Sequence, residues 1–141
     1  QKLNLILRDS KVDTLLHISS AGTVYGEYID EPFKEDSLLL PISWYGRAKT
    51  IEESLYEKQA YEFGFNYKCA RLANPFGNEV YTKHGFIDVL INTVKTGGIF
   101  NTFKDHGHCR DFIHSSDMAE VIVNILLMES TNPFSQTIKN I

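Results

Sequence analysis

Two short strand-like runs, on either side of an amphipathic stretch, constrain the fold of this chain most strongly. Residues 14–19 have the length and apolar character of a strand buried on both faces of a parallel sheet, and residues 67–73 form the next strand. Between them, Ser43 is placed to cap a helix that Gly64 terminates. The apolar positions of this helix recur at i, i+4, i+7 and i+11: Trp44, Ala48, Ile51 and Leu55. Because parallel strands joined by a helix need a right-handed crossover, we predict an α/β fold whose ligands bind beyond the carboxyl ends of the strands.

The rest of the chain repeats these patterns. Helical spacing of apolar residues predicts helices over 1–9 and 86–94, and short apolar runs predict strands over 99–103 and 137–141. A last helix is expected to begin with Ser115 or Ser116 as its cap. Its expected buried stripe is Met118, Val121, Ile122, Ile125 and Leu126.

Tyr45 and Lys49 are the first candidate catalytic residues. Residues four apart on a helix project from the same face, so a phenol and an ammonium lie side by side. A free tyrosine titrates near ~10, and bringing this to about 7, where a general base works best, takes roughly 4 kcal/mol of preference for the phenolate. A neighbouring ammonium supplies that preference, and the hydroxyls of Ser20 and Thr23 are placed to hold a substrate oxygen beside the phenol. The same spacing also fits a half-buried tyrosine and a solvated lysine with no catalytic role.

Four motifs together resemble the extended short-chain dehydrogenase/reductase family. In order along the chain they are Ser-Ser-x-x-Thr-Val-Tyr-Gly at 19–26, Tyr-x-x-x-Lys at 45–49, Arg-x-x-Asn-x-x-Gly at 71–77 and Arg-Asp-Phe-Ile at 110–113. Within that family the chain is most similar to the NAD-dependent nucleotide-sugar epimerases of the UDP-glucose 4-epimerase type. The resemblance implies an incomplete doubly wound, Rossmann-like parallel sheet with part of a small substrate-binding region.

The resemblance also implies a reaction, namely NAD-dependent epimerisation of a nucleotide sugar, at C4 of a UDP-hexose. Tyr45 deprotonates the sugar hydroxyl while hydride passes to the nicotinamide, and the transient ketone takes the hydride back on its other face. Lys49 holds the nicotinamide ribose and favours the phenolate, while the backbone near Ala73 touches the nicotinamide. The implied nucleotide-sugar ligands are Asn74, Asn101, Phe103 and the diphosphate-binding Arg110.

One position departs from the family pattern. The family usually carries its catalytic Ser or Thr two residues before Thr23, where this chain has Ala21. Thr23 or Ser20 must then supply the hydroxyl, and we favour Thr23. Dehydratase relatives place an Asp-Glu pair at the positions of Gly22 and Thr23, so its absence argues against dehydration.

The resemblance assigns the segments of the chain. Residues 1–76 correspond to the second half of a Rossmann-like NAD domain, residues 77–110 to a substrate-binding segment, and residues 111–141 to a return helix and strand. The family's glycine-rich NAD-binding half and its C-terminal end have no counterpart here, so we expect the middle portion of a longer protein. Family members commonly dimerise through helices that correspond to residues 1–9 and 44–63, which implies a homodimer.

Composition narrows the class of partner. With a net charge of −4 over 141 residues, the chain has no basic field of the kind that binds nucleic acid. It has neither a signal peptide nor an apolar run of about 18 residues, so no membrane association is expected. Cys69 and Cys109 fit reduced thiols in a cytoplasmic protein without a disulfide.

Metal binding is not expected at either of two tempting clusters. The acidic residues between 27 and 36 read as a solvated loop, and His106, His108 and Cys109 lack a fourth ligand at a zinc spacing. His17, inside the first strand, is interpreted as a packed and hydrogen-bonded core residue. The acidic residues are Glu27, Asp30, Glu31, Glu35 and Asp36.

Two other functions stay open. Because the glycine-rich half is missing, the chain also fits a truncated, non-catalytic relative that acts as a binding or interaction module. A related reductase or dehydratase is the other alternative. Net consumption of NADPH separates a reductase from an epimerase, and an unchanged turnover in Tyr45→Phe would exclude the epimerase.

Overall fold

A computed structural model describes residues 2–9, 11–27, 32–77, 85–101, 110–129 and 136–141. Its main sheet has three parallel strands in the order β1 (Thr14–Ser20), β2 (Asn66–Leu72) and β5 (Gln136–Asn140). All seven residues of β1 pair in register with β2, from Thr14 opposite Asn66 to Ser20 opposite Leu72. The strands therefore end together at one edge of the sheet, and the predicted parallel α/β architecture is confirmed.

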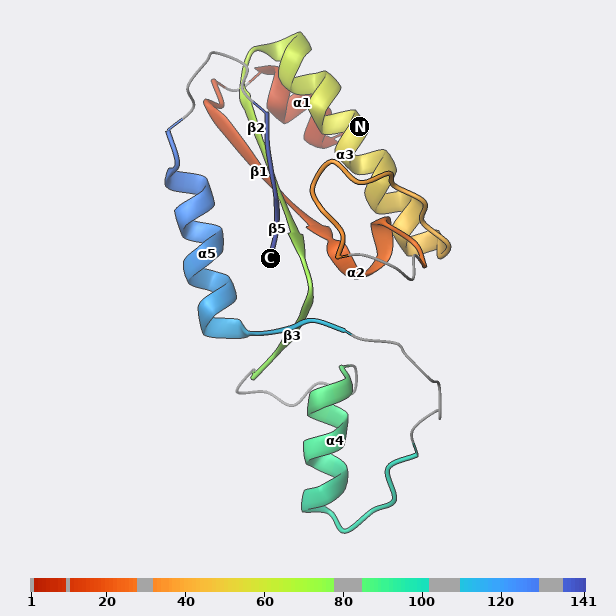
Figure 1. Ribbon diagram of the computed structural model, residues 1–141. Coiled ribbons are helices and arrows are strands. Elements are labelled where there is room, and N and C mark those ends of the chain that lie inside the picture. The colour runs from red at the N-terminus through yellow and green to blue at the C-terminus, as the bar shows by residue number, and fades with distance from the viewer. Residues whose placement is uncertain (1, 10, 28–31, 78–84, 102–109, 130–135) are drawn as a thin grey trace.

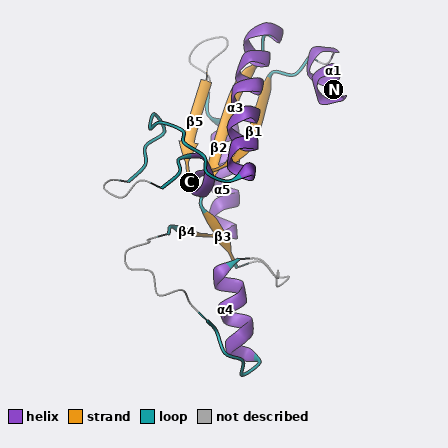
Figure 2. Cartoon of the chain, turned by 90° about the vertical axis from the view of Figure 1, so that its right-hand side faces the viewer, coloured by secondary structure: helices purple, strands orange, loops and turns teal. Residues whose placement is uncertain are grey.

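Helices cover both faces of this sheet. Figure 1 shows α3 (Trp44–Phe63) on one side of the strands and α5 (Ser115–Leu127) on the other, with α1 (Lys2–Asp9) next to α3. The turned view of Figure 2 shows α3 running alongside β1 and β2. The short α2 (Ala21–Val24) follows β1 without a gap. Among the described residues, no helix combines the length and the apolar character needed to cross a bilayer.

Local signals set both ends of α3 as predicted. The Ser43 hydroxyl accepts a hydrogen bond from the Gly46 N–H at 3.0 Å, which satisfies one of the free donors at the helix start. Gly64 ends the helix in the left-handed conformation, with φ at 78°, and donates its N–H to the Ala60 carbonyl.

The four apolar positions predicted to form the buried stripe of α3 do not face the core. Trp44 is 83% exposed and Ile51 is 67% exposed, and Ala48 and Leu55 are exposed as well. An apolar stripe normally packs on the core, but here the side toward the sheet carries buried polar residues such as Glu53 and Gln59. The polar partners of Glu53, namely Arg71 and Ser19, lie on other elements, so the orientation follows from contacts rather than from helical periodicity.

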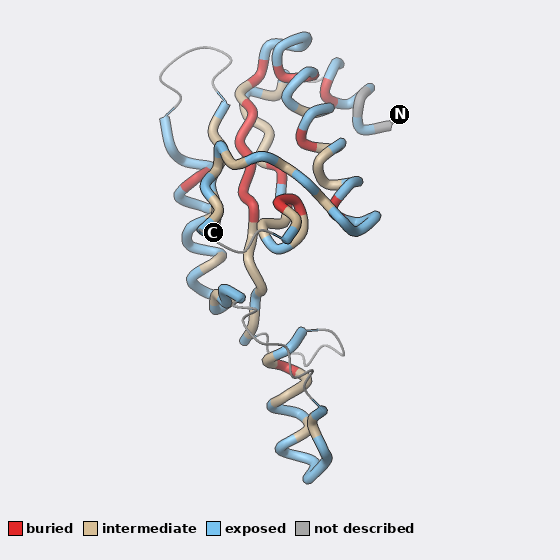
Figure 3. Tube along the Cα trace, turned by 45° about the vertical axis from the view of Figure 1, so that its right-hand side comes forward, coloured by how far each residue is buried: buried red, intermediate tan, exposed pale blue. Residues whose placement is uncertain are grey.

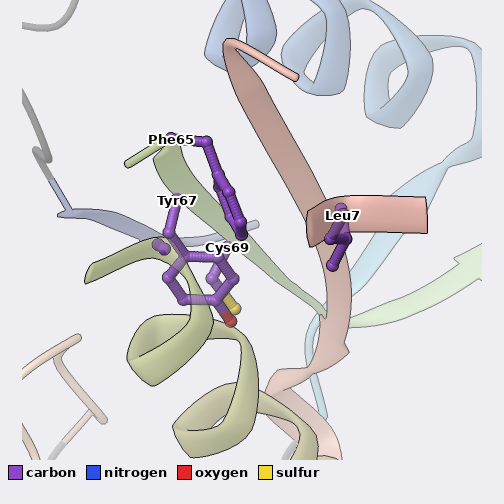
Figure 4. Close-up of a cluster of buried hydrophobic side chains, with 5 residues drawn as sticks. Leu7, Phe65, Tyr67 and Cys69 are labelled. Atoms are coloured by element: carbon purple, nitrogen blue, oxygen red, sulfur yellow. The ribbon is translucent and has the colours of Figure 1, made fainter. Parts of the chain in front are cut away.

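The hydrophobic core lies between α1, α3 and the first two strands. Leu7, Phe65, Tyr67 and Cys69 pack together in Figure 4, and Ala60 completes the cluster. Cys69 is a free thiol, and burial raises its pKa to about 12. A thiol in this state is a packing residue rather than a nucleophile.

A second, smaller region lies beyond the carboxyl ends of the strands. There β3 (Asn74–Phe76) pairs in parallel with β4 (Phe112–His114), and α4 (Phe86–Lys95) stands farther out in Figure 1. Burial is concentrated along the sheet, whereas most of α4 is exposed or half-buried in Figure 3.

The strand predicted over 99–103 is wrong for residues 99–101, which are loop, while residues 102 and 103 lie outside the described residues. Phe100 instead packs edge-on against Phe86 at the start of α4, with ring centroids 5.3 Å apart. That contact turns the segment back onto the helix.

The start of α5 also differs from the prediction. His114, not Ser115 or Ser116, is the cap, because its Nδ1 accepts a hydrogen bond from the Ser116 N–H. Of the predicted stripe, Ile125 is buried, whereas Val121 and Leu126 are exposed.

The other end of α5 is held by Lys68 of β2, which is buried. Its ammonium donates to the Leu126 and Met128 carbonyls at 2.9 and 2.5 Å.

Candidate active site

The predicted site residues Ser20, Thr23, Ala73 and Asn74 gather at the carboxyl edge of the sheet. Ser20 is the last residue of β1 and pairs with Leu72, which immediately precedes Ala73. Thr23 lies one turn into α2, directly after that strand. The Ala73 N–H donates to the Ile141 carbonyl at 2.6 Å, which ties the end of the chain to the same edge.

A glycine brings the start of α3 against α2. A Cβ on Gly46 would collide with the Thr23 carbonyl and meet the Pro41 side chain at 3.0 Å. The helix that carries Tyr45 therefore sits directly against the turn that carries Thr23. The Thr23 hydroxyl oxygen is buried and has no hydrogen-bond partner within the described residues, so the fold there leaves it uncommitted. Ser20, the cap of α2, makes no side-chain cap hydrogen bond.

Lys49 is held in place by two acceptors. Its Nζ donates to the Ile18 carbonyl at 3.2 Å and to Glu52 Oε2 at 2.9 Å. The same Nζ lies 5.9 Å from the centroid of the Tyr45 ring, so the predicted pairing of phenol and ammonium is present. The hydrogen bond to Glu52 raises the pKa of Lys49, which keeps the ammonium charged. Tyr45 itself is 56% exposed and thus open to a ligand.

Sequence reasoning missed the groups behind Lys49. Glu52 also contacts buried His17, with Oε2 at 3.1 Å from Nε2, and the Nδ1 of His17 lies 3.0 Å from the Tyr67 hydroxyl. His17 is thus the packed, hydrogen-bonded residue that was predicted, and burial lowers its pKa despite the hydrogen bond to Glu52. The available signal was the spacing of Lys49 and Glu52, three residues apart on one helix.

A buried ion pair lies next to these groups. Arg71 Nη2 contacts Glu53 Oε2 at 2.6 Å, and the Ser19 hydroxyl donates to Glu53 Oε1 at 2.5 Å. Arg71 also donates to the Tyr25 hydroxyl at 2.7 Å. Burial alone would raise the pKa of Glu53, but the hydrogen bonds from Arg71 and Ser19 hold it below its ordinary value. This network fixes α3 against the ends of β1 and β2.

The predicted substrate-binding residues are only partly brought together. The Asn74 amide Nδ2 donates to the Asp111 carbonyl at 2.9 Å, so Arg110, which is exposed, stands one residue from the partner of Asn74. Asn101 is exposed in the loop after α4, and no described contact joins it to the other site residues. Phe103 lies outside the described residues.

No group of three or more His, Cys, Asp or Glu side chains suitable for a metal ion occurs in the described part of the chain. The His106, His108 and Cys109 cluster falls outside it, as do Asp30 and Glu31 of the acidic run.

The sequence is 29% identical over 119 residues to a dTDP-4-dehydro-6-deoxyglucose reductase of Escherichia coli, covering 83% of this chain and 37% of the relative. It is 28% identical over 117 residues to a putative UDP-glucose 4-epimerase of Methanocaldococcus jannaschii, covering 82% of this chain and 38% of the relative. The chain thus spans little more than a third of the length of these curated relatives.

A solved structure shows the same fold. The UDP-glucose 4-epimerase of Thermotoga maritima, crystallised with UDP-glucose, is 27% identical and superposes with a TM-score of 0.83, covering 99% of this chain and 44% of that one. The predicted Rossmann-like architecture is therefore confirmed. The profile of the NAD dependent epimerase/dehydratase family matches residues 2–138, and the predicted family and its cofactor class are thereby confirmed as well. On this match the chain belongs to the NAD-dependent epimerase/dehydratase family.

Proposed function

We propose that the full-length protein carrying this chain catalyses NAD-dependent epimerisation of a nucleotide sugar, at C4 of a UDP-hexose. The observation that carries the proposal is the fixed Lys49 ammonium beside the Tyr45 ring at the carboxyl edge of the sheet. The family match and the similarity to two 4-epimerases support it.

The residues present fit one end of a dinucleotide. An ammonium has three N–H donors, and the described contacts of Lys49 use two of them, on the Ile18 carbonyl and Glu52. The third is available for a ribose hydroxyl. When bound, NAD supplies the hydride acceptor and donor for the reaction. Holding that end of the cofactor beside Tyr45 is the task assigned here to Lys49 and the backbone near Ala73.

In this proposal Tyr45 takes the proton from the sugar hydroxyl as the carbon that bears this hydroxyl is oxidised. Tyr45 returns the proton when the resulting ketone is reduced on its other face. The positive charge of Lys49 favours the phenolate that this step requires. The uncommitted hydroxyl of Thr23, or that of Ser20, holds the reacting oxygen in place of the family Ser or Thr that Ala21 replaces. The nucleotide sugar is held by Asn74, Asn101, Phe103 and Arg110.

The same proposal includes three further statements about the protein. Its segments are bounded at 1–76, 77–110 and 111–141, it forms a homodimer through α1 and α3, and it is located in the cytoplasm. The exposed apolar residues of α1 and α3 support the dimer: Leu3, Leu5, Ile6, Trp44, Ile51 and Leu55. Buried free Cys69 supports a location where thiols stay reduced.

A reductase is the second candidate, and the 29% identity to the Escherichia coli reductase favours it. One experiment separates the two. The full-length protein is incubated with UDP-glucose and sub-stoichiometric NAD, and separately with dTDP-4-dehydro-6-deoxyglucose and NADPH. An epimerase converts UDP-glucose to its C4 epimer over many turnovers without net change in NADH, whereas a reductase consumes NADPH in proportion to product. Activity in neither assay would favour the non-catalytic alternative.

A further inference from the structure

Behind the Tyr45–Lys49 pair, a line of hydrogen bonds leads into the core. It runs from the Lys49 ammonium to Glu52, from Glu52 to His17 of β1, and from His17 to the Tyr67 hydroxyl of β2. Tyr67 is 2% exposed and His17 is 8% exposed, so the inner end of the line is sealed from solvent. Glu52 is half-buried and bridges the sealed end to the open site.

The protons along this line have one consistent arrangement. Hydrogen bonds from Lys49 and His17 keep the pKa of Glu52 below its ordinary value, so Glu52 is a carboxylate that only accepts. His17 Nε2 must then donate to it, and in a neutral histidine Nδ1 accepts from the Tyr67 hydroxyl. Burial lowers the pKa of His17 and favours that neutral form. Each polar group in the line therefore has a partner, and Glu52 is fixed from both sides.

The charge of Glu52 opposes that of Lys49 at the phenol. A carboxylate 2.9 Å from the ammonium offsets part of the positive field that the Tyr45 ring receives. The titratable groups that face this cluster are Tyr45, Tyr56 and Glu53 on α3, His17 on β1, and Tyr67 and Cys69 on β2. Of these, Glu53 is already paired with Arg71, so Glu52 is the anion that acts on Lys49 directly.

We propose that Glu52 and His17 are positioning residues for Lys49: they hold its ammonium beside the Tyr45 ring and limit how strongly its charge favours the phenolate. The catalytic part of this inference rests on the proposed function, whereas the electrostatic part concerns the phenol alone. Neither residue belongs to the four motifs that carry the family resemblance.

The test is Glu52→Gln in the full-length protein, with Glu57→Gln as the matched control, since Glu57 is exposed on the same helix. The amide still accepts a hydrogen bond from Lys49 but carries no charge. We expect the phenolate absorbance of Tyr45, isolated by subtracting the titration of Tyr45→Phe, to appear about 0.5 to 1 pH unit lower in Glu52→Gln than in wild type. The acidic limb of the pH profile of kcat/KM should move by the same amount, and Glu57→Gln should move neither.

Two further variants test the positioning role of His17. His17→Leu removes the donor to Glu52 and should lower kcat severalfold without moving the acidic limb, while His17→Gln keeps a donor and should restore most of the loss. Thermal melts identify a His17 variant that does not fold. In that case the Glu52→Gln titration alone tests the inference.

The outcomes separate the two proposals. If Glu52→Gln moves neither the phenolate titration nor the acidic limb while Tyr45→Phe abolishes turnover, the inference is wrong and the function stands. If the titration moves but Tyr45→Phe keeps wild-type turnover, the electrostatic part of the inference stands, and the proposed function is wrong together with the catalytic part that rests on it.

Discussion

The N-terminal half of α3 carries charged groups on one face and apolar groups on the other. Toward the sheet, Glu53 is 5% exposed and bonds Arg71 and Ser19, and Lys49 and Glu52 reach the end and middle of β1. Toward the outside stand apolar Trp44 and Ile51. A surface helix ordinarily has the reverse arrangement. Near the strand ends, the inner face of α3 is therefore organised around charged groups, whereas apolar side chains are exposed on its outer face.

The largest loss of stability is expected when the ion pair between Arg71 and Glu53, on the inner face of α3, is broken. Arg71→Leu leaves Glu53 as a buried, unpaired carboxylate, which should lower the free energy of unfolding by about 3–5 kcal/mol. Urea denaturation measures this change. The matched control is Lys58→Ala, which breaks the exposed Lys58–Glu62 pair on the same helix and should cost less than about 1 kcal/mol. Equal losses in the two variants would remove the contrast between the faces.

The same ion pair predicts a pH dependence. Because the folded pKa of Glu53 lies below its ordinary value of 4.5, its contribution to stability is complete above that pH and is lost as pH falls through the folded pKa. Wild-type protein should therefore lose stability more steeply than Glu53→Gln below about pH 4.5. Since Glu35 and Glu52 also have lowered pKa values and remain in both proteins, the difference between the two curves isolates Glu53. Parallel curves would contradict the assignment.

A smaller effect is expected at the contact between α3 and α2. Gly46→Ala places a methyl group against the Thr23 carbonyl and should cost about 1–3 kcal/mol, together with a loss of turnover because Tyr45 is displaced. Gly22→Ala is the control, since an added Cβ there meets nothing within 4 Å. Thermal denaturation and kcat measured on both variants test the prediction. A Gly46→Ala protein as stable and active as Gly22→Ala would show that the close approach has no consequence.

The smallest effect on stability is expected on the outer face. Ile51→Glu replaces an exposed apolar residue by a charge, so the free energy of unfolding of the monomer should change by no more than about 0.5 kcal/mol. The same change should weaken self-association strongly if α3 forms the proposed dimer, because it places two like charges in an apolar interface. Analytical ultracentrifugation over a range of concentrations measures this. An unchanged association constant would move the dimer contact elsewhere.

The parts of the fold that the sequence predicted correctly depend on signals within a few residues. The strands predicted at 14–19 and 67–73, which the structure has at 14–20 and 66–72, are of this kind, as are the Ser43 cap and the Gly64 terminus. The orientation of α3 was not predictable in that way, because it is set by Glu53 and Arg71, which are 18 residues apart and belong to different elements. Likewise His114 caps α5 in place of the predicted serines, because its ring nitrogen accepts a hydrogen bond from the Ser116 N–H.

In the candidate site as well, some contacts were predictable from the sequence and others were not. The spacing of Tyr45 and Lys49 predicted their contact, and the order of the strands predicted that Thr23 and Asn74 share one edge. The contact of Glu52 with His17 was not predicted, because the two residues are 35 positions apart and His17 was interpreted only as a core residue. Long-range polar pairs of this kind leave no periodic trace in a sequence.

We propose that Tyr45 performs the proton transfer, and a comparison of Tyr45→Phe with Tyr61→Phe in the full-length protein tests this role. Tyr61 lies on the same helix and is 82% exposed, so its loss controls for removal of a surface phenol. The measured quantity is the rate of C4 epimer formation from UDP-glucose with NAD. We expect Tyr45→Phe to lower kcat by about 10²-fold or more and Tyr61→Phe to leave it unchanged. Equal turnover in wild type and Tyr45→Phe would contradict this role.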